Sequence, residues 1–181
     1  MRYVTAVVLA VVRKGSRAVG MVPQMQRMPG YLRSLLGLLA QAGSGPLIRM
    51  TAAVAIRNCV LTHRNWTRTM KEVLDPQHTV ILEDDKKFMR DNILEVAMTL
   101  SEKPLIKTLA EAIVVMVEDE YITKWPGFLP AVEANLARVS ELTRLHNILL
   151  VVRKVAKQYE YYGSQVLGWE CMHFQVWVLV E

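Results

Sequence analysis

The stretch PLIKTLAEAIVVMV at residues 104–117 carries the clearest structural signal in this chain of 181 residues. Its apolar side chains return every third or fourth position, which places them on one side of an α-helix. A proline opens the stretch, and proline suits the first turn of a helix because its missing N–H would be unpaired there. We therefore predict an amphipathic helix with the inward stripe Ile106, Leu109, Ala110, Ile113, Met116 and Val117.

The same pattern recurs on both sides of this helix. Residues 31–41 and 46–63 indicate two helices separated by Gly43-Ser44-Gly45, and residues 83–100 indicate another. Trp125-Pro126 is expected to open a further helix. The last and best-patterned helix carries the predicted inward stripe Leu142, Leu145, Ile148, Leu149, Val152, Val155, Ala156 and Tyr159.

These segments give helix–turn–helix three times. The unit from Pro104 to Leu142 is about 38 residues long, close to the 40–47 residues of HEAT and armadillo repeats. In such arrays each hairpin buries its stripe on its neighbours. We therefore predict an all-α fold, a HEAT-repeat α-solenoid of about three helical hairpins with atypical termini.

The composition fits a folded protein with a large core. Hydrophobic residues make up 52% of the chain and charged residues 22%, which excludes disorder over most of its length. The nine glycines have no period and there are only two cysteines, which excludes collagen and disulfide scaffolds. Two lone thiols, Cys59 and Cys171, fit a reducing compartment.

The two ends differ from the middle and set the expected boundaries at 1–28, 29–162 and 163–181. The apolar run Val4–Val12 is too short to span a bilayer, which takes about 20 residues, so we expect no membrane insertion. It suits a helix or a frayed end, with a targeting segment as the alternative. In the last segment, residues 176–180 are typical of a strand.

Positive charge is concentrated in the first part of the chain. Residues 1–74 contain eleven Lys or Arg and a single acid, Glu72. Such a surface either meets an acidic partner or is simply solvated. A basic helical nucleic-acid-binding protein is therefore an alternative, which would bind less tightly as salt rises. It is disfavoured because aromatic residues for base stacking are not interleaved with these bases.

Four patches, in order, resemble the N-terminal HEAT repeats of the importin-beta (karyopherin-beta) family. They are PLIRMTAAVAIRNCVLTHRNW at 46–66, EDDKKFMRDNILEVAMTL at 83–100, TLAEAIVVMVEDEYITKWPGFLP at 108–130 and VVRKVAKQYEYY at 151–162. The resemblance covers residues 28–162 and is greatest to the importin-7/importin-8 subgroup, followed by the exportin that recycles importin-alpha. Its structural motif residues are Arg49, Trp66, Tyr121, Trp125 and Pro126.

The resemblance implies a nuclear transport receptor rather than an enzyme, without a cofactor. Its implied partners are Ran GTPase in its GTP state, basic protein cargo such as ribosomal proteins and histones, and nucleoporins. Its implied location is nucleus and cytoplasm, with the mitochondrion as the alternative if residues 1–29 are a transit peptide. Residues 1–27 do not match the family's start, and the family's chains continue further, so a truncated solenoid without its own activity is another reading.

Two groups of residues are candidates for partner binding. Arg57 and Asn58 lie on the second helix of a hairpin, the side expected to line the concave surface of a HEAT stack. The alternative is that Asn58 bonds a neighbouring loop backbone, as buried asparagines usually do. Glu118, Asp119 and Glu120 could meet basic residues of a GTPase or cargo by charge complementarity. The alternative for these three acids is a solvated turn.

The remaining candidates have structural or negative interpretations. Trp66 and the pair Trp125-Pro126 are expected to pack between hairpins. The four histidines are scattered singly, which gives no metal spacing. Gly43-Ser44-Gly45 lacks the Gly-Lys that follows in a phosphate-binding loop, and no catalytic triad or carboxylate pair can be singled out. The sequence therefore predicts no catalytic residue and no metal ligand.

Overall fold

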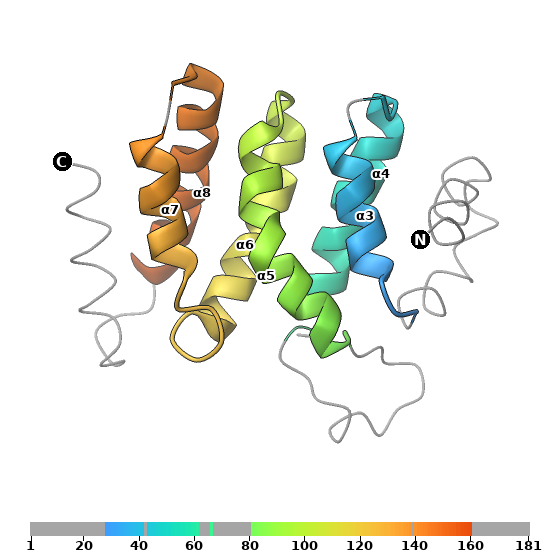
Figure 1. Cartoon of the computed structure of the whole chain (residues 1–181), viewed down its shortest axis with the longest axis horizontal. Helices are drawn as coiled ribbons and strands as arrows, with labels where there is room; N and C mark the ends of the chain where they lie inside the picture. Colours follow the sequence, from blue (N-terminus) through green and yellow to red (C-terminus); the bar gives the residue numbers. More distant parts are fainter. Residues whose placement is uncertain (1–27, 42, 62–65, 67–80, 139, 161–181) are drawn as a thin grey trace.

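Three helical hairpins stand in a row in the computed structural model (Figure 1). The structure describes residues 28–41, 43–61, 66, 81–138 and 140–160. Within these ranges the chain forms α3 (Tyr31–Ala40), α4 (Pro46–Leu61), α5 (Glu83–Thr99), α6 (Lys103–Glu120), α7 (Phe128–Ala137) and α8 (Leu142–Glu160).

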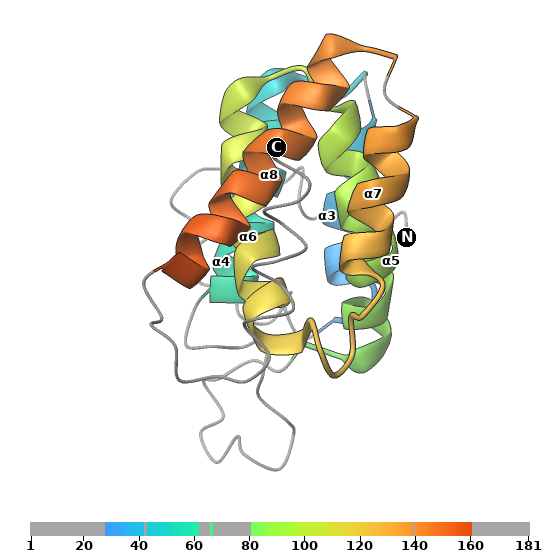
Figure 2. The same ribbon diagram turned by 90° about the vertical axis from the view of Figure 1, so that its left-hand side faces the viewer.

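The hairpins form two layers of helices. Figure 2 shows α4, α6 and α8 on one side and α3, α5 and α7 on the other. Helix α6 packs between α4 and α8, and α3 packs against α5. The described residues contain helices and no strand, so the predicted all-α HEAT-type solenoid of three hairpins is confirmed.

The local sequence explains where α6 begins and which side it buries. Pro104 occupies the first turn, where its lack of an N–H costs nothing. The predicted inward residues are all at most 1% exposed, because their spacing holds them on the side that contacts α4 and α8. They join one continuous hydrophobic core that runs from Tyr31 to Val155. Neighbouring hairpins therefore share their buried surface, as in a repeat array.

The phase predicted for α8 is partly wrong. Leu142 is 85% exposed and Leu149 is 42% exposed, although both were expected inside. The side chains that α8 buries against α5 and α6 are Asn147, Ile148, Val151, Val152 and Val155. The buried side of α8 is rotated relative to this prediction. The reason is that α8 packs against α5 and α6 of the neighbouring hairpin as well as against its own hairpin partner α7.

One predicted boundary also shifts. Trp125-Pro126 lies in the turn before α7, which begins at Phe128. The end predicted at residue 63 for the helix that begins at Pro46 falls outside the described residues. The predictions for Val4–Val12 and for the strand at 176–180 fall outside the described residues. Among the described helices, none combines the length and the apolar character needed to cross a membrane.

Candidate partner-binding surface

The outward side of α4, α6 and α8 forms one face across all three hairpins, here called the α4–α6–α8 face. Each helix buries its opposite side in the core. The residues that this face presents include Val54, Arg57 and Asn58 on α4, Lys107, Glu111 and Glu118 on α6, and Leu149, Arg153, Lys154 and Lys157 on α8.

A chain of ion pairs crosses this face. Glu111 on α6 pairs with Arg57 on α4 and with Lys154 on α8, whose Nζ lies 3.1 Å from Glu111 Oε1. The Lys154 ammonium also donates to the backbone oxygen of Lys107 at 3.2 Å. Burial alone would raise the pKa of Glu111, but hydrogen bonds from Arg57 and Lys154 hold this pKa below its ordinary value. Glu111 is therefore a carboxylate at neutral pH and ties the three hairpins together.

The structure places Arg57 and Asn58 on this face. Arg57 is engaged with Glu111, and its guanidinium also donates to the side-chain oxygen of Asn58 at 3.4 Å. Asn58 is exposed, so the alternative of a half-buried asparagine that bonds a loop does not fit it. Partner binding by these two residues stays a prediction.

The buried backbone-bonding asparagine is instead Asn147, which the sequence reasoning missed. It is 1% exposed, and its side-chain amide donates to the carbonyl oxygens of Ala97 at 3.1 Å and Leu100 at 2.8 Å. These carbonyls end α5, where the helix leaves its last acceptors without internal donors. The sequence signal that could have identified Asn147 is its position as an amide side chain among the apolar residues of α8.

The three acids at the end of α6 do not form one surface. Glu118 is exposed, Asp119 is half-buried and Glu120 is only 4% exposed. Successive residues of a helix point about 100° apart, so three neighbours cannot share a side. For Glu120 this replaces the expected surface role: its carboxylate lies 2.8 Å from Arg90 and 3.7 Å from Lys124.

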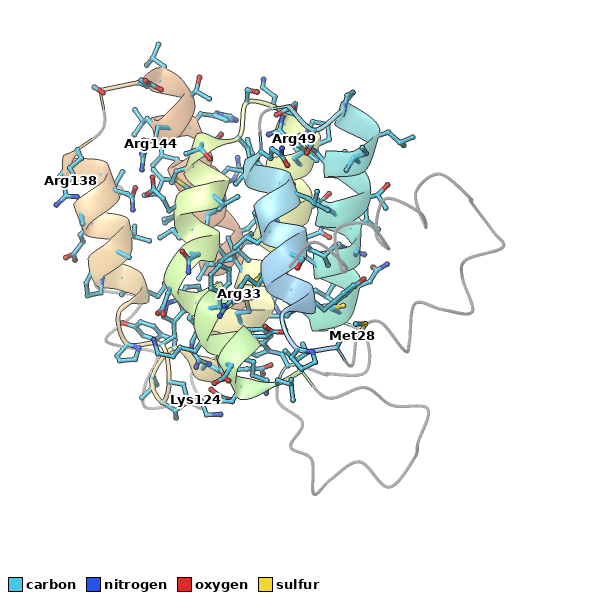
Figure 3. All side chains as sticks on the ribbon, turned by 45° about the vertical axis from the view of Figure 1, so that its right-hand side comes forward. Met28, Arg33, Arg49, Lys124, Arg138 and Arg144 are labelled. Atoms are coloured by element: carbon cyan, nitrogen blue, oxygen red, sulfur yellow. The ribbon has the colours of Figure 1, made fainter. Side chains whose placement is uncertain are left out.

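Arg90 is a second residue that sequence reasoning left without a role. Its side chain is 9% exposed and bridges Glu120 to Glu83, which lies 2.7 Å away. Lys124 also lies 3.7 Å from Glu83, so four charged side chains alternate in sign at one end of the second hairpin. Figure 3 shows Lys124 at that end and Arg49 at the opposite end.

Of the five motif residues of the family resemblance, the two tryptophans are buried. Arg49 donates to the carbonyl oxygen of Leu39 at 3.2 Å and pairs with Glu102, which joins the end of α3 to the start of α6. Trp66 is fully buried, and the Lys86 ammonium lies 5.8 Å from its ring centroid.

The motif after α6 also packs inward in part. Trp125 is 7% exposed and meets Phe128 edge to face, with ring centroids 5.1 Å apart. Tyr121 is half-buried and Pro126 is exposed. The buried tryptophan thus anchors the turn between α6 and α7.

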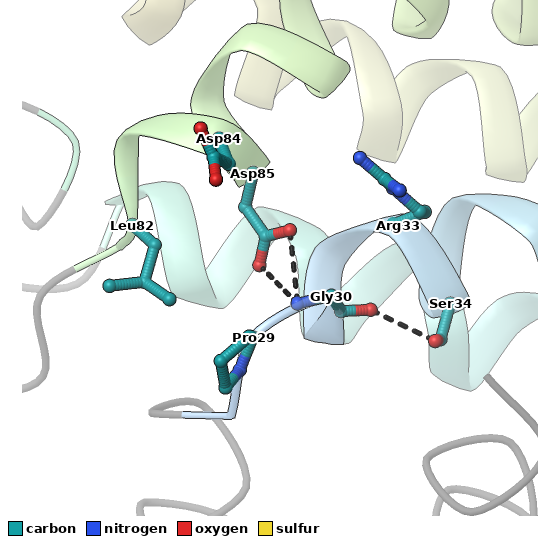
Figure 4. Close-up of a pocket in the computed structure, with 7 residues that line it drawn as sticks. All are labelled: Pro29, Gly30, Arg33, Ser34, Leu82, Asp84 and Asp85. Carbon is teal, nitrogen blue, oxygen red and sulfur yellow. Dashed lines mark hydrogen bonds between the residues drawn. The ribbon is translucent and has the colours of Figure 1, made fainter.

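A hollow of about 320 Å³ lies between the starts of α3 and α5 (Figure 4). Both carboxylate oxygens of Asp85 accept the N–H of Gly30 at 3.1 Å, so an acid of α5 caps α3. Gly30 has φ 78°, a conformation that glycine adopts without strain. Burial raises the pKa of Asp85, although the Gly30 N–H and the Arg33 guanidinium oppose this rise. The hollow is therefore built around a structural cap.

In the described part of the chain, no group of His, Cys, Asp and Glu is arranged to hold a metal ion. The surface of this part carries ion pairs, exposed bases and acids, and scattered apolar side chains. Such groups suit contact with another protein.

The comparisons with known proteins agree with this fold. Residues 22–99 match the family model of the importin-beta N-terminal domain, a range that includes α3, α4 and α5. An importin beta-like SAD2 homolog of Arabidopsis thaliana is 24% identical over 143 residues. That alignment covers 78% of this chain and 13% of the relative's length.

Importin-beta family proteins are transport receptors rather than enzymes, and they shuttle between nucleus and cytoplasm. Their N-terminal domain is the region that binds Ran in its GTP state. The matched domain, the related sequence and the row of helical hairpins agree with one another. From these three findings we conclude that this chain is similar to the N-terminal domain of the importin-beta family.

Proposed function

We propose that this chain binds Ran in its GTP state and acts in nucleocytoplasmic transport. The observation that carries this proposal is the match of residues 22–99 to the importin-beta N-terminal domain. Helix α4 is the part of the α4–α6–α8 face that falls inside the matched range. The proposed Ran contact is therefore the outward side of α4, with Val54, Arg57 and Asn58.

The exposure of these residues supports the choice of surface. Val54 is 39% exposed and Asn58 is exposed, and both sit beside the Arg57–Glu111 pair. An exposed aliphatic side chain beside polar groups and a fixed ion pair is the mixture found at non-obligate protein interfaces.

Binding of the full chain to Ran, loaded either with a non-hydrolysable GTP analogue or with GDP, tests the proposal. We expect tight binding only of the GTP form. Asn58→Arg should weaken it about tenfold, or about 1.4 kcal/mol, by placing an extra charge in the contact. Gln41→Arg, an equal change at an exposed position between α3 and α4, should leave it unchanged. Equal binding of both nucleotide forms, or none of either, would refute the proposal.

We further propose that the chain shuttles between nucleus and cytoplasm, binds nucleoporins and carries basic cargo. Glu118 supports the cargo proposal, since it is an exposed carboxylate with no ion pair among the described residues. A fluorescent fusion should distribute between nucleus and cytoplasm; accumulation in mitochondria would instead support the transit-peptide alternative for residues 1–29. A histone should bind the wild-type chain more tightly than the Glu118→Lys variant.

A further inference from the structure

The α4–α6–α8 face becomes more basic from the first hairpin to the third. Four bases, Lys107 on α6 and Arg153, Lys154 and Lys157 on α8, surround a single acid, Glu111. We call them the α6–α8 basic patch. Lys107, Arg153 and Lys157 are exposed, and the Lys154 side chain is 33% exposed. The hydrogen bond from Lys154 to the Lys107 backbone places the two helices' bases next to each other.

The charge of this patch is not balanced within the described residues. Glu111 already forms ion pairs with Arg57 and Lys154, so its negative charge does not balance the other three bases. The described ion pairs leave Lys107, Arg153 and Lys157 without an acid. Bases that lie one turn apart on a helix repel each other unless an anion comes between them. An acidic partner would therefore gain electrostatic energy here that the isolated chain does not have.

The apolar surroundings indicate which kind of acidic partner fits. Leu149 is 42% exposed and lies one helical turn before Arg153, on the same side of α8. A peptide with both carboxylates and apolar side chains would use the leucine and the bases together. A phosphate backbone would leave the leucine exposed, so an acidic peptide uses more of this surface than a nucleic acid does.

We propose that the α6–α8 basic patch binds an acidic amphipathic peptide segment of a partner protein. The segment's apolar side chain covers Leu149, and its carboxylates pair with Arg153, Lys157 and Lys107. The whole patch follows residue 99, where the matched domain ends. It therefore lies outside the matched range, and its test does not rest on the proposal that α4 contacts Ran.

Fluorescence anisotropy of a labelled peptide against the full chain tests this inference. The probe has 19 residues, the length of α8, with leucine on one helical side and Glu or Asp on the other. A second peptide replaces every acid by its amide, and a third probe is a single-stranded oligonucleotide. We expect the acidic peptide to bind about tenfold tighter than the amide peptide, or about 1.4 kcal/mol, and more weakly as salt rises.

Three variants locate the site. Arg153→Glu and Lys157→Glu together should weaken binding of the acidic peptide at least tenfold, and Lys107→Glu alone should weaken it less. Leu149→Ser should weaken both peptides. Arg138→Glu reverses one exposed base after α7, as Lys107→Glu does in the patch; it is the control for that single reversal and should leave binding unchanged. All these side chains are exposed or partly exposed, and circular dichroism checks that each variant keeps its helices.

Each other result overturns the inference. Equal binding of the acidic and amide peptides would mean that only the leucine matters. Tighter binding of the oligonucleotide, lost in the Arg153→Glu/Lys157→Glu variant, would assign the patch to nucleic acid. Salt-sensitive self-association without peptide binding would assign it to a second copy of the chain. An equal loss in Arg138→Glu would reduce the effect to net charge.

Discussion

At the scale of single residues, one type of side chain has different roles depending on which side of the helix it lies on. Glu118 and Glu120 are two positions apart, yet one is exposed and the other is 4% exposed between Arg90 and Lys124. Sequence reasoning grouped them because they are adjacent acids. Arg90, the ion-pair partner of Glu120, is 30 positions away in the sequence, so the residues next to Glu120 could not reveal it.

The Glu120 pair gives a direct stability prediction. Glu120→Ala leaves the Arg90 guanidinium, 9% exposed, with only Glu83 as a partner. We expect a loss of about 3 kcal/mol in the free energy of unfolding, because one half of a buried ion pair is left uncompensated. Glu118→Ala is the matched control two positions away and should change it by less than about 0.5 kcal/mol. Urea unfolding measures both, and equal effects would contradict the buried network.

Glu111 predicts part of the pH dependence of stability. Its pKa lies below the ordinary 4.5 in the folded chain, so its ionised form stabilises the fold above that pH. This contribution is lost as the pH falls through the folded-state pKa. Glu111→Gln should therefore flatten the decline of the free energy of unfolding in acid. Glu133→Gln, at an exposed glutamate of α7, should keep the wild-type slope. An unchanged slope in Glu111→Gln would contradict the stabilising ion pairs of Glu111 with Arg57 and Lys154.

At the scale of elements, the helices were predictable and the rotation of one of them was not. The proline and the stripe of α6 identify both its start and its buried side, since it has neighbours on two flanks. In α8 a run of apolar residues permits several phases. Contact with α5 and α6 selects the one that buries Ile148 and Val151 and leaves Leu149 outside. Tertiary contacts therefore settle what periodicity leaves open.

Two adjacent residues of α8 test this phase. Ile148 is fully buried and Leu149 is 42% exposed. Ile148→Ala should lower the free energy of unfolding by about 2–5 kcal/mol, because it removes core methyl groups and leaves a cavity. Leu149→Ala should lower it by less than about 1 kcal/mol, since less of its area leaves water on folding than at Ile148. Thermal or urea unfolding compares them, and a larger loss for Leu149→Ala would restore the phase predicted from sequence.

At the scale of the whole molecule, a row of hairpins follows from the sequence, whereas the pairing between hairpins does not. Three amphipathic hairpins at similar spacing predict stacking, because no hairpin can bury its stripe alone. The ion pairs between hairpins join residues 43 to 54 positions apart, including Arg57–Glu111 and Lys154–Glu111. Partners so far apart in the sequence leave no local pattern. The sequence could therefore place the candidate residues on particular helices, but it could not identify the residues that they contact.

The row predicts an unequal distribution of local stability. Helix α6 packs between α4 and α8, and α5 contacts α3, α6 and α8, whereas α8 is the main neighbour of α7. Local opening costs more where more buried surface must separate, with each 1.4 kcal/mol slowing amide exchange about tenfold. Hydrogen exchange followed by mass spectrometry should therefore find the slowest amides in α6 and faster exchange in α7. Protection that is uniform from α3 to α8 would instead show that the hairpins open as a single unit.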